Sequence, residues 1–208
     1  TVLRNVQPIF AEFEFGGLGI GHNGNLTNAF TLRKRLVERG CIFQSTMDTE
    51  IIVHLIAISQ FSTVFDRMID ALRHVEGAYS LVALTKDALI GVRDPLGVRP
   101  LVLGRIDGSY IMTSETCALD IIGAEFIRDV DPGEIVIVDN DGIRSIKPFT
   151  KEPKKLCIFE YIYFARPDSN VEGQNVYEVR KQIGAELARE RNIEADVVVP
   201  VPDSGVPA

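Results

Sequence analysis

The hydrophobic positions at the start of the chain follow a two-residue period. Apolar and polar residues alternate from Ile9 to Phe15, and Gly16-Gly17 supplies a turn before a second run, Leu18 to Gly21. A two-residue period places alternate side chains on one face of a sheet. The pattern therefore predicts two paired strands.

The hydrophobic positions of the next segments have helical spacing. Thr27 or Asn28 can cap a helix that ends at Gly40, and its apolar positions are Phe30, Leu32, Leu36 and Val37. The segment from Ile51 to Ile58 is so apolar that, as a helix, it must be buried on most of its surface. An amphipathic helix is predicted from Thr63 to Val75.

The next pattern is one of short apolar runs separated by Gly and Pro, which predicts strands. They are Ala78–Leu84, Ala88–Val92, Leu101–Leu103, Tyr110–Thr113, Glu134–Val138 and Ile143–Ile146. A brief helix is predicted at Cys117–Ile122, and Asp139–Gly142 suits the turn of a hairpin.

The best linker candidate is Lys147–Lys155, which holds two prolines and four lysines. We therefore predict one domain over residues 1–150 and the start of another over 151–208. In the second, helical spacing over Val176–Glu190 precedes an apolar strand, Asp196–Val201. A helix followed by a buried strand and a small-residue loop is typical of a parallel α/β unit.

Composition excludes several classes of protein. A net charge of −7 and a pI near 5.0 provide no basic field for nucleic acid. No run approaches the roughly 18 apolar residues of a membrane span, so we expect no membrane partner and a cytoplasmic location. The three cysteines form no CxxC pair, which disfavours a disulfide framework or a self-contained zinc site. Both ends look cut, so we expect part of the machinery to lie outside this sequence.

Two short motifs admit a structural and a chemical interpretation. Asn23-Gly24 is a favoured pair for a tight hairpin turn, but a carboxamide beside a glycine N–H can also hold the oxyanion of an acyl-transfer intermediate. Asp48 can cap the buried helix, or it can bind the amino group of an amino-acid substrate. Spacing alone does not choose between these interpretations.

Several blocks resemble the class II glutamine amidotransferases, which are N-terminal-nucleophile hydrolases. They are the Asn5-Val6-Gln7-Pro8 segment, the run HNGNLTN from His22 to Asn28, and Asp48-Thr49-Glu50. The block from Cys157 to Ser169, with Val199 to Ser204, resembles the amidophosphoribosyltransferase family of purine biosynthesis in particular. The resemblance covers nearly the whole chain.

The resemblance implies release of ammonia from glutamine and its attack on C1 of phosphoribosyl pyrophosphate, giving phosphoribosylamine. It implies that Asn23 and the Gly24 amide form the oxyanion hole and that Asp48 binds the glutamine amino group. The implied fold is α+β, an incomplete αββα sandwich followed by the start of a type I phosphoribosyltransferase α/β domain. Mg²⁺ on the diphosphate and a homo-oligomer are also expected.

The chain departs from the family pattern at the nucleophile. The family uses an N-terminal Cys whose own amine acts as base, whereas position 1 is Thr1, which we do not assign to that role. The Arg of the family's Arg-Tyr-Ser-Thr motif is also missing. We therefore predict that this chain by itself is inactive. The alternatives are a non-catalytic glutaminase-like scaffold and an amidotransferase similar to glucosamine-phosphate synthase.

The resemblance also suggests roles in the last third of the chain. Cys157 is either a buried structural thiol or a ligand of a [4Fe-4S] cluster, whose other ligands this chain would not supply. The loop Asp203-Ser204-Gly205 is a candidate pyrophosphate site. Arg166 and Asp168 are candidates for coupling between the two active sites.

Two further segments are predicted to be structural. Arg93-Asp94 is expected to form a partially buried pair in a rigid connection between strands, and Ser114-Glu115 is interpreted in the same way. Tyr161, Tyr163 and Phe164 are predicted mainly as strand residues that pack between layers.

Overall fold

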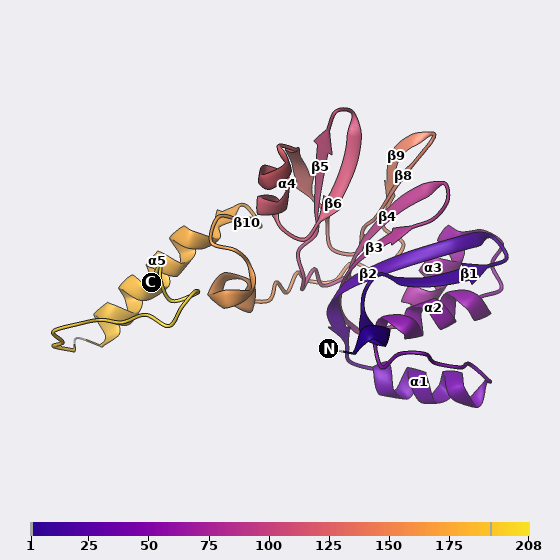
Figure 1. Cartoon of the computed structure of the whole chain (residues 1–208), viewed down its shortest axis with the longest axis horizontal. Coiled ribbons are helices and arrows are strands. Elements are labelled where there is room, and N and C mark those ends of the chain that lie inside the picture. The colour runs from indigo at the N-terminus through magenta and orange to yellow at the C-terminus, as the bar shows by residue number, and fades with distance from the viewer. Residues whose placement is uncertain (1, 192) are drawn as a thin grey trace. The chain divides into compact units, whose positions relative to one another are not determined.

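The computed structural model describes residues 2–191 and 193–208, which form two compact units (Figure 1). Within the described residues, the first comprises 2–101 and 130–155, and the second comprises 102–129 and 156–208. The segment between Val102 and Asp129 thus clusters with the last part of the chain. The predicted domain boundary near residue 150 stays a prediction.

The first unit is built on a six-stranded antiparallel sheet with the order β1-β2-β3-β4-β8-β9. Its strands are β1 (Ile9–Phe13), β2 (Gly16–Leu26), β3 (Gly77–Leu84), β4 (Ala88–Arg93), β8 (Ile135–Asp139) and β9 (Gly142–Ile146). The predicted pairing of the first two strands and the predicted hairpin at Asp139–Gly142 are confirmed. The first turn is Glu14-Phe15 and not Gly16-Gly17, because both glycines pair with β1 as the first residues of β2. Strand β2 is far longer than predicted.

Three helices accompany this sheet: α2 contacts β1 and β2, and α1 and α3 pack against α2. Figure 1 shows α2 and α3 beside β1 and β2. The helices are α1 (Ala29–Glu38), α2 (Thr49–Ile58) and α3 (Val64–Leu72), and a short 3-10 turn, Leu3–Asn5, precedes β1. Helix α2 is almost entirely buried, as its apolar sequence predicts. The Thr63 hydroxyl accepts from the Asp66 amide and begins α3.

The apolar face of α1 is narrower than predicted. Leu32 and Leu36 are buried, but Phe30 is 83% exposed and Val37 is 54% exposed. Asn28 precedes the helix without capping it, because its side chain bonds the carbonyl of His74 and the amide of Glu76 instead. Asn28 therefore fixes the connection between α3 and β3.

The second unit contains a three-stranded antiparallel sheet with the order β6-β5-β7. Its elements are β5 (Val102–Ile106), β6 (Ser109–Thr113), α4 (Thr116–Ile122), β7 (Glu125–Asp129), a π-helical turn (Glu160–Phe164), β10 (Asn170–Val171), β11 (Gln174–Asn175) and α5 (Val176–Glu190). Helix α5 has its predicted bounds. Strand β7 was not predicted, because its first three residues are all exposed and give no alternation.

Two strand predictions in this unit are wrong. Asp196–Val201 is irregular, and Val198 is 87% exposed, because none of the strands described in the chain pairs with it. The aromatic run lies in the π-helical turn. There Tyr161 is buried and donates its hydroxyl to the Val171 carbonyl, while Tyr163 is 55% exposed.

The α+β class with antiparallel sheets is confirmed by these two units. The four-layer sandwich and the phosphoribosyltransferase domain stay predictions. No helix in the described ranges has the length and apolar character needed to cross a membrane.

Candidate functional site

Asn23 and Gly24 lie within strand β2 and not in a turn. Asn23 pairs with Ser80 and Gly24 with Tyr79, in a ladder that runs from Gly19 to Leu26 against β3. The hairpin-turn interpretation of Asn23-Gly24 is therefore wrong. Pairing along the whole strand outweighs the local preference of two residues.

Gly24 occupies a position that admits no side chain. Its φ is +156°, and a Cβ there would lie 2.0 Å from the Ala78 carbonyl oxygen and 2.7 Å from His22 Nε2. Strand β3 thus approaches the backbone of β2 more closely than any residue with a Cβ allows. The glycine is required by this close approach.

The amide of Gly24 lies at the edge of β2 that faces away from β3. In an antiparallel strand the N–H groups of residues two apart point to the same side. The His22 amide donates to the Gln7 side chain and the Leu26 amide to Asp48, whereas the Thr27 amide faces the other way, to the Glu76 carbonyl. The Gly24 N–H therefore shares the edge of His22 and Leu26.

Asp48 lies at the same edge. Its Oδ2 accepts from the Leu26 amide at 2.8 Å, and its Oδ1 lies 3.5 Å from His22 Nδ1. The His22 side chain is 2% exposed and also contacts the Thr49 hydroxyl at 3.1 Å. Asp48 precedes α2 but makes no side-chain capping bond, so the predicted capping role is wrong. The carboxylate is oriented toward β2.

Competing effects set the charge of Asp48. Burial raises the pKa of the Asp48 carboxyl, but the hydrogen bonds from His22 and from the Leu26 amide outweigh burial, so the pKa lies below its ordinary value. The carboxylate is thus held ionised throughout the neutral range. A fixed anion of this kind can bind an ammonium group.

This lowered pKa predicts a pH-dependent contribution to stability. The pKa of Asp48 is lower in the folded state than in the unfolded state. Ionised Asp48 therefore stabilises the fold at pH values above the unfolded-state pKa, and this stabilisation is lost as the pH falls through the folded-state pKa. The Asp48→Asn variant is expected to be less stable than the parent by about 1 kcal/mol near neutral pH. Urea unfolding should show that difference shrinking below about pH 4. A difference independent of pH would contradict this account.

Arg99 is a site residue that the sequence analysis missed. Its Nη2 donates to Asn23 Oδ1 at 2.9 Å, although 76 positions separate the two residues. No local pattern in the sequence signals a contact of this range. Arg99 lies in the connection between β4 and β5 that was predicted to be rigid.

That connection is more deeply buried than predicted. Arg93 is 1% exposed and Asp94 is fully buried. The Asp94 carboxylate accepts from the amides of Leu96 and Val98. Burial raises the pKa of Asp94 above its ordinary value, although these amides partly oppose the shift. The structural role predicted for this pair agrees with these contacts.

The candidate residues of the second unit form no comparable arrangement. Asp203 is exposed, while Ser204 and Gly205 border a hollow of about 220 Å³ with Ile162 and Ile183. Across residues 2–191 and 193–208 no group of three or more His, Cys, Asp or Glu could hold a metal ion, so Cys157 has no cluster of ligands around it. The roles of Cys157 and of this loop stay predictions.

Glu115 connects two parts of the second unit. Its carboxylate accepts from the Arg166 amide at 2.7 Å and from the Ser169 hydroxyl at 2.8 Å. The Arg166 guanidinium pairs with Asp168, and both side chains are more than half exposed. The coupling role of this pair stays a hypothesis. Thr1 lies outside the residues that the structure describes.

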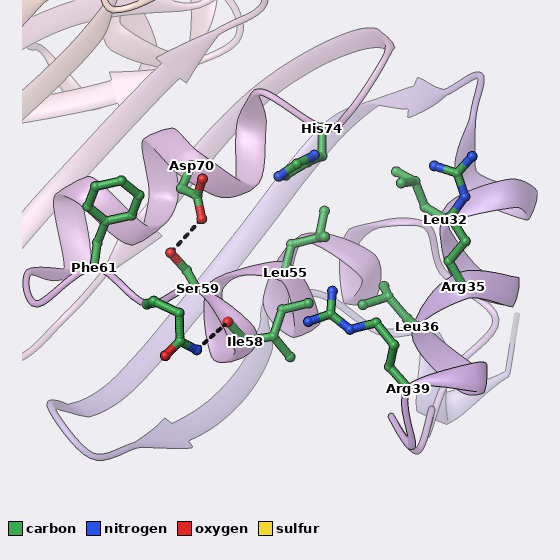
Figure 2. Close-up of a pocket in the computed structure, with 11 residues that line it drawn as sticks. Leu32, Arg35, Leu36, Arg39, Leu55, Ile58, Ser59, Phe61, Asp70 and His74 are labelled. Carbon is green, nitrogen blue, oxygen red and sulfur yellow. Dashed lines mark hydrogen bonds between the residues drawn. The ribbon is translucent and has the colours of Figure 1, made fainter.

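A larger hollow of the first unit lies elsewhere, between α1, α2 and α3 (Figure 2). It measures about 400 Å³, and the Ser59 hydroxyl donates to Asp70 beside it at 2.6 Å. Its lining residues are Leu32, Arg35, Leu36, Arg39, Leu55, Ile58, Ser59, Gln60, Phe61, Asp70 and His74. Neither Asn23, Gly24 nor Asp48 is among them, so the hollow is separate from the β2 edge.

Known proteins match this chain in both sequence and fold. Residues 2–120 match the family described as the glutamine amidotransferase domain. The chain is 57% identical to the amidophosphoribosyltransferase of Rhizobium etli and 52% identical to amidophosphoribosyltransferase 1, chloroplastic, of Arabidopsis thaliana. Both similarities cover 100% of this chain, but 43% and 37% of the respective relatives.

A solved structure shows the same fold. The glutamine phosphoribosylpyrophosphate amidotransferase from B. subtilis, complexed with ADP and GMP, superposes with a TM-score of 0.93 at 42% identity. The superposition covers 98% of this chain and 45% of that one. The chain thus spans less than half the length of each of these three relatives.

Proposed function

Because the chain belongs to the glutamine amidotransferase domain family, we propose that it forms the glutamine-hydrolysing part of an amidophosphoribosyltransferase. The whole protein would transfer ammonia from glutamine to phosphoribosyl pyrophosphate, releasing glutamate and pyrophosphate and forming phosphoribosylamine. The relatives that cover the full chain carry the amidophosphoribosyltransferase name.

One observation carries the proposal: the Asp48 carboxylate and the Gly24 amide share one edge of β2. A substrate with an ammonium group and a carboxamide carbonyl, as glutamine has, can contact an anion and a neutral donor together. Asn23 precedes Gly24 and offers a second donor without adding charge. Neutral donors suit an oxyanion that exists only during the reaction.

The proposed chemistry gives each residue a role. A cysteine thiol supplied by the whole protein attacks the glutamine carbonyl, and negative charge moves to its oxygen. The Asn23 carboxamide and the Gly24 N–H donate to that oxygen, while Asp48 holds the amino group. Collapse of the intermediate breaks the C–N bond, and the nitrogen takes the thiol proton and leaves as ammonia. The thioester that remains is hydrolysed by water to glutamate and the free thiol. That this chain by itself lacks the nucleophile stays a prediction.

We extend the proposal to the rest of the protein. Residues 1–150 would form part of a four-layer αββα sandwich, and the chain after residue 150 would begin a phosphoribosyltransferase domain. Asp203, Ser204 and Gly205 would contact the pyrophosphate group, and Mg²⁺ would neutralise the diphosphate. A homo-oligomer remains our expectation for the assembly.

The Asp48→Asn variant of the full-length protein tests the proposal. Loss of the carboxylate removes the partner of the ammonium group, so the KM for glutamine should rise about 10- to 100-fold. Activity with free ammonia should stay at the parent level, because ammonia needs no glutamine site. Steady-state kinetics with each nitrogen donor measure both effects.

A matched control is Asp87→Asn, at an exposed position between β3 and β4. It should change neither activity. An unchanged KM for glutamine in Asp48→Asn, or an equal loss of the ammonia-dependent activity, would contradict the proposed function.

A further inference from the structure

We propose that Arg99 is a positioning residue for glutamine hydrolysis. It holds the Asn23 carboxamide so that the Nδ2 group of Asn23 faces the reacting carbonyl of glutamine. The proposal rests on the function proposed above and adds a residue outside the substrate contacts. Its basis is the 2.9 Å hydrogen bond from Arg99 Nη2 to Asn23 Oδ1.

The chemistry of the two side chains fixes the orientation. A guanidinium carries five N–H donors and no acceptor, so the Asn23 atom that it contacts must be the carbonyl oxygen. The Nδ2 group then lies on the opposite side of the carboxamide. A half-turn of the amide would place Nδ2 against the guanidinium, where two donors face each other, and would present oxygen to a developing negative charge.

The backbone of Arg99 is itself anchored. Its carbonyl oxygen accepts from the Ser80 hydroxyl at 3.2 Å and from Arg93 Nε at 2.8 Å. Ser80 is 4% exposed and Arg93 is 1% exposed, so neither donor can move without disturbing the core. Ser80 is also the residue of β3 that pairs with Asn23.

Both partners of the Arg99–Asn23 hydrogen bond are thus held by the same buried part of the structure, the β2–β3 ladder. Ser80 faces Asn23 across the β2–β3 ladder and bonds the backbone of the arginine that bonds the Asn23 side chain. The carboxamide is thus preorganised, which is the condition under which a hydrogen-bond donor lowers a reaction barrier. The guanidinium charge also polarises the amide, which strengthens its N–H groups as donors.

The test uses Arg99→Met and Arg99→Lys in the full-length protein. Met removes the donors at similar length, so kcat with glutamine should fall about 10- to 100-fold while the KM for glutamine stays near the parent value. Lys can donate one bond, so its kcat should lie between those of Met and the parent. Activity with ammonia should not change in either variant, and Arg73→Met, at an exposed arginine after α3, serves as control.

A double-mutant cycle with Asn23→Ala separates positioning from a general structural effect. If Arg99 acts through Asn23, the double variant should lose no more than Asn23→Ala alone. If the kcat losses of the two single variants multiply in the double variant, or if Arg99→Met keeps a parent-like kcat, the positioning role is overturned and the oxyanion assignment stands. Parent-like hydrolysis by Asn23→Ala would instead overturn the oxyanion assignment and this proposal with it. If Arg99→Met does not fold, the cycle is run with Arg99→Lys.

Discussion

Replacement of Gly24 by alanine is expected to abolish glutamine-dependent activity and to destabilise the first unit. The added Cβ would lie 2.0 Å from the Ala78 carbonyl oxygen and 2.8 Å from its carbonyl carbon, and both belong to rigid backbone. Strands β2 and β3 would have to separate locally. Overpacking of this kind costs about 3 kcal/mol, and it displaces the proposed oxyanion donor.

Gly19 provides the matched control for this change. It lies in the same strand, but a Cβ there would meet no atom within 4 Å. The Gly19→Ala variant should therefore keep the activity and melting temperature of the parent protein. Glutaminase assays and thermal unfolding of both variants measure the effects. Near-parent activity in Gly24→Ala would show that the close approach at Ala78 is not needed for function.

Short-range structure was well predicted from the sequence. The β1–β2 pairing, the hairpin at Asp139–Gly142 and the helix from Val176 to Glu190 depend on residues close together in the chain. Their turn residues and hydrophobic period act locally, so a single sequence contains the signal. Burial of α2 followed from its apolar composition for the same reason.

The main errors in the predictions from sequence come from strand pairing between residues far apart in the chain. Asn23-Gly24 has the local signal of a turn, but strand β3, more than fifty residues further along, extends β2 through it. The apolar run Asp196–Val201 has the composition of a buried strand, yet a strand needs a partner. Apolar composition shows that a segment can be buried as a strand, but the strand forms only where a neighbouring strand pairs with it.

The candidate site was predicted only through resemblance. Asn23, Gly24 and Asp48 were assigned by their motifs, and spacing alone left each with a structural interpretation. The structure adds that Asp48 bonds β2 beside Gly24. His22 begins the HNGNLTN run, but the sequence assigned no role to it or to Arg99, because the contacts by which they orient these groups depend on the folded chain.

Replacement of Arg93 by methionine is expected to cause the largest loss of stability in the connection that carries Arg99. The Arg93 guanidinium donates to the carbonyls of Val130 at 2.8 Å, Gly97 at 3.0 Å and Arg99 at 2.8 Å, and the side chain is 1% exposed. Methionine fills much of the volume but donates nothing. Three carbonyl oxygens would lose a donor in a buried environment, at a cost of about 3 to 5 kcal/mol.

The exposed Arg144 is a suitable control, because it pairs with Asp139 at the surface and its loss should cost less than about 1 kcal/mol. Urea unfolding of Arg93→Met, Arg93→Lys and Arg144→Met measures these costs. Lysine has one ammonium group and cannot reach three carbonyls that surround a planar guanidinium, so Arg93→Lys should be destabilised nearly as much as Arg93→Met. Equal stability of the Arg93 and Arg144 variants would show that the buried guanidinium does not hold this connection. Because Arg93 also anchors the Arg99 carbonyl, variants that do fold should have a reduced kcat with glutamine and an unchanged response to ammonia.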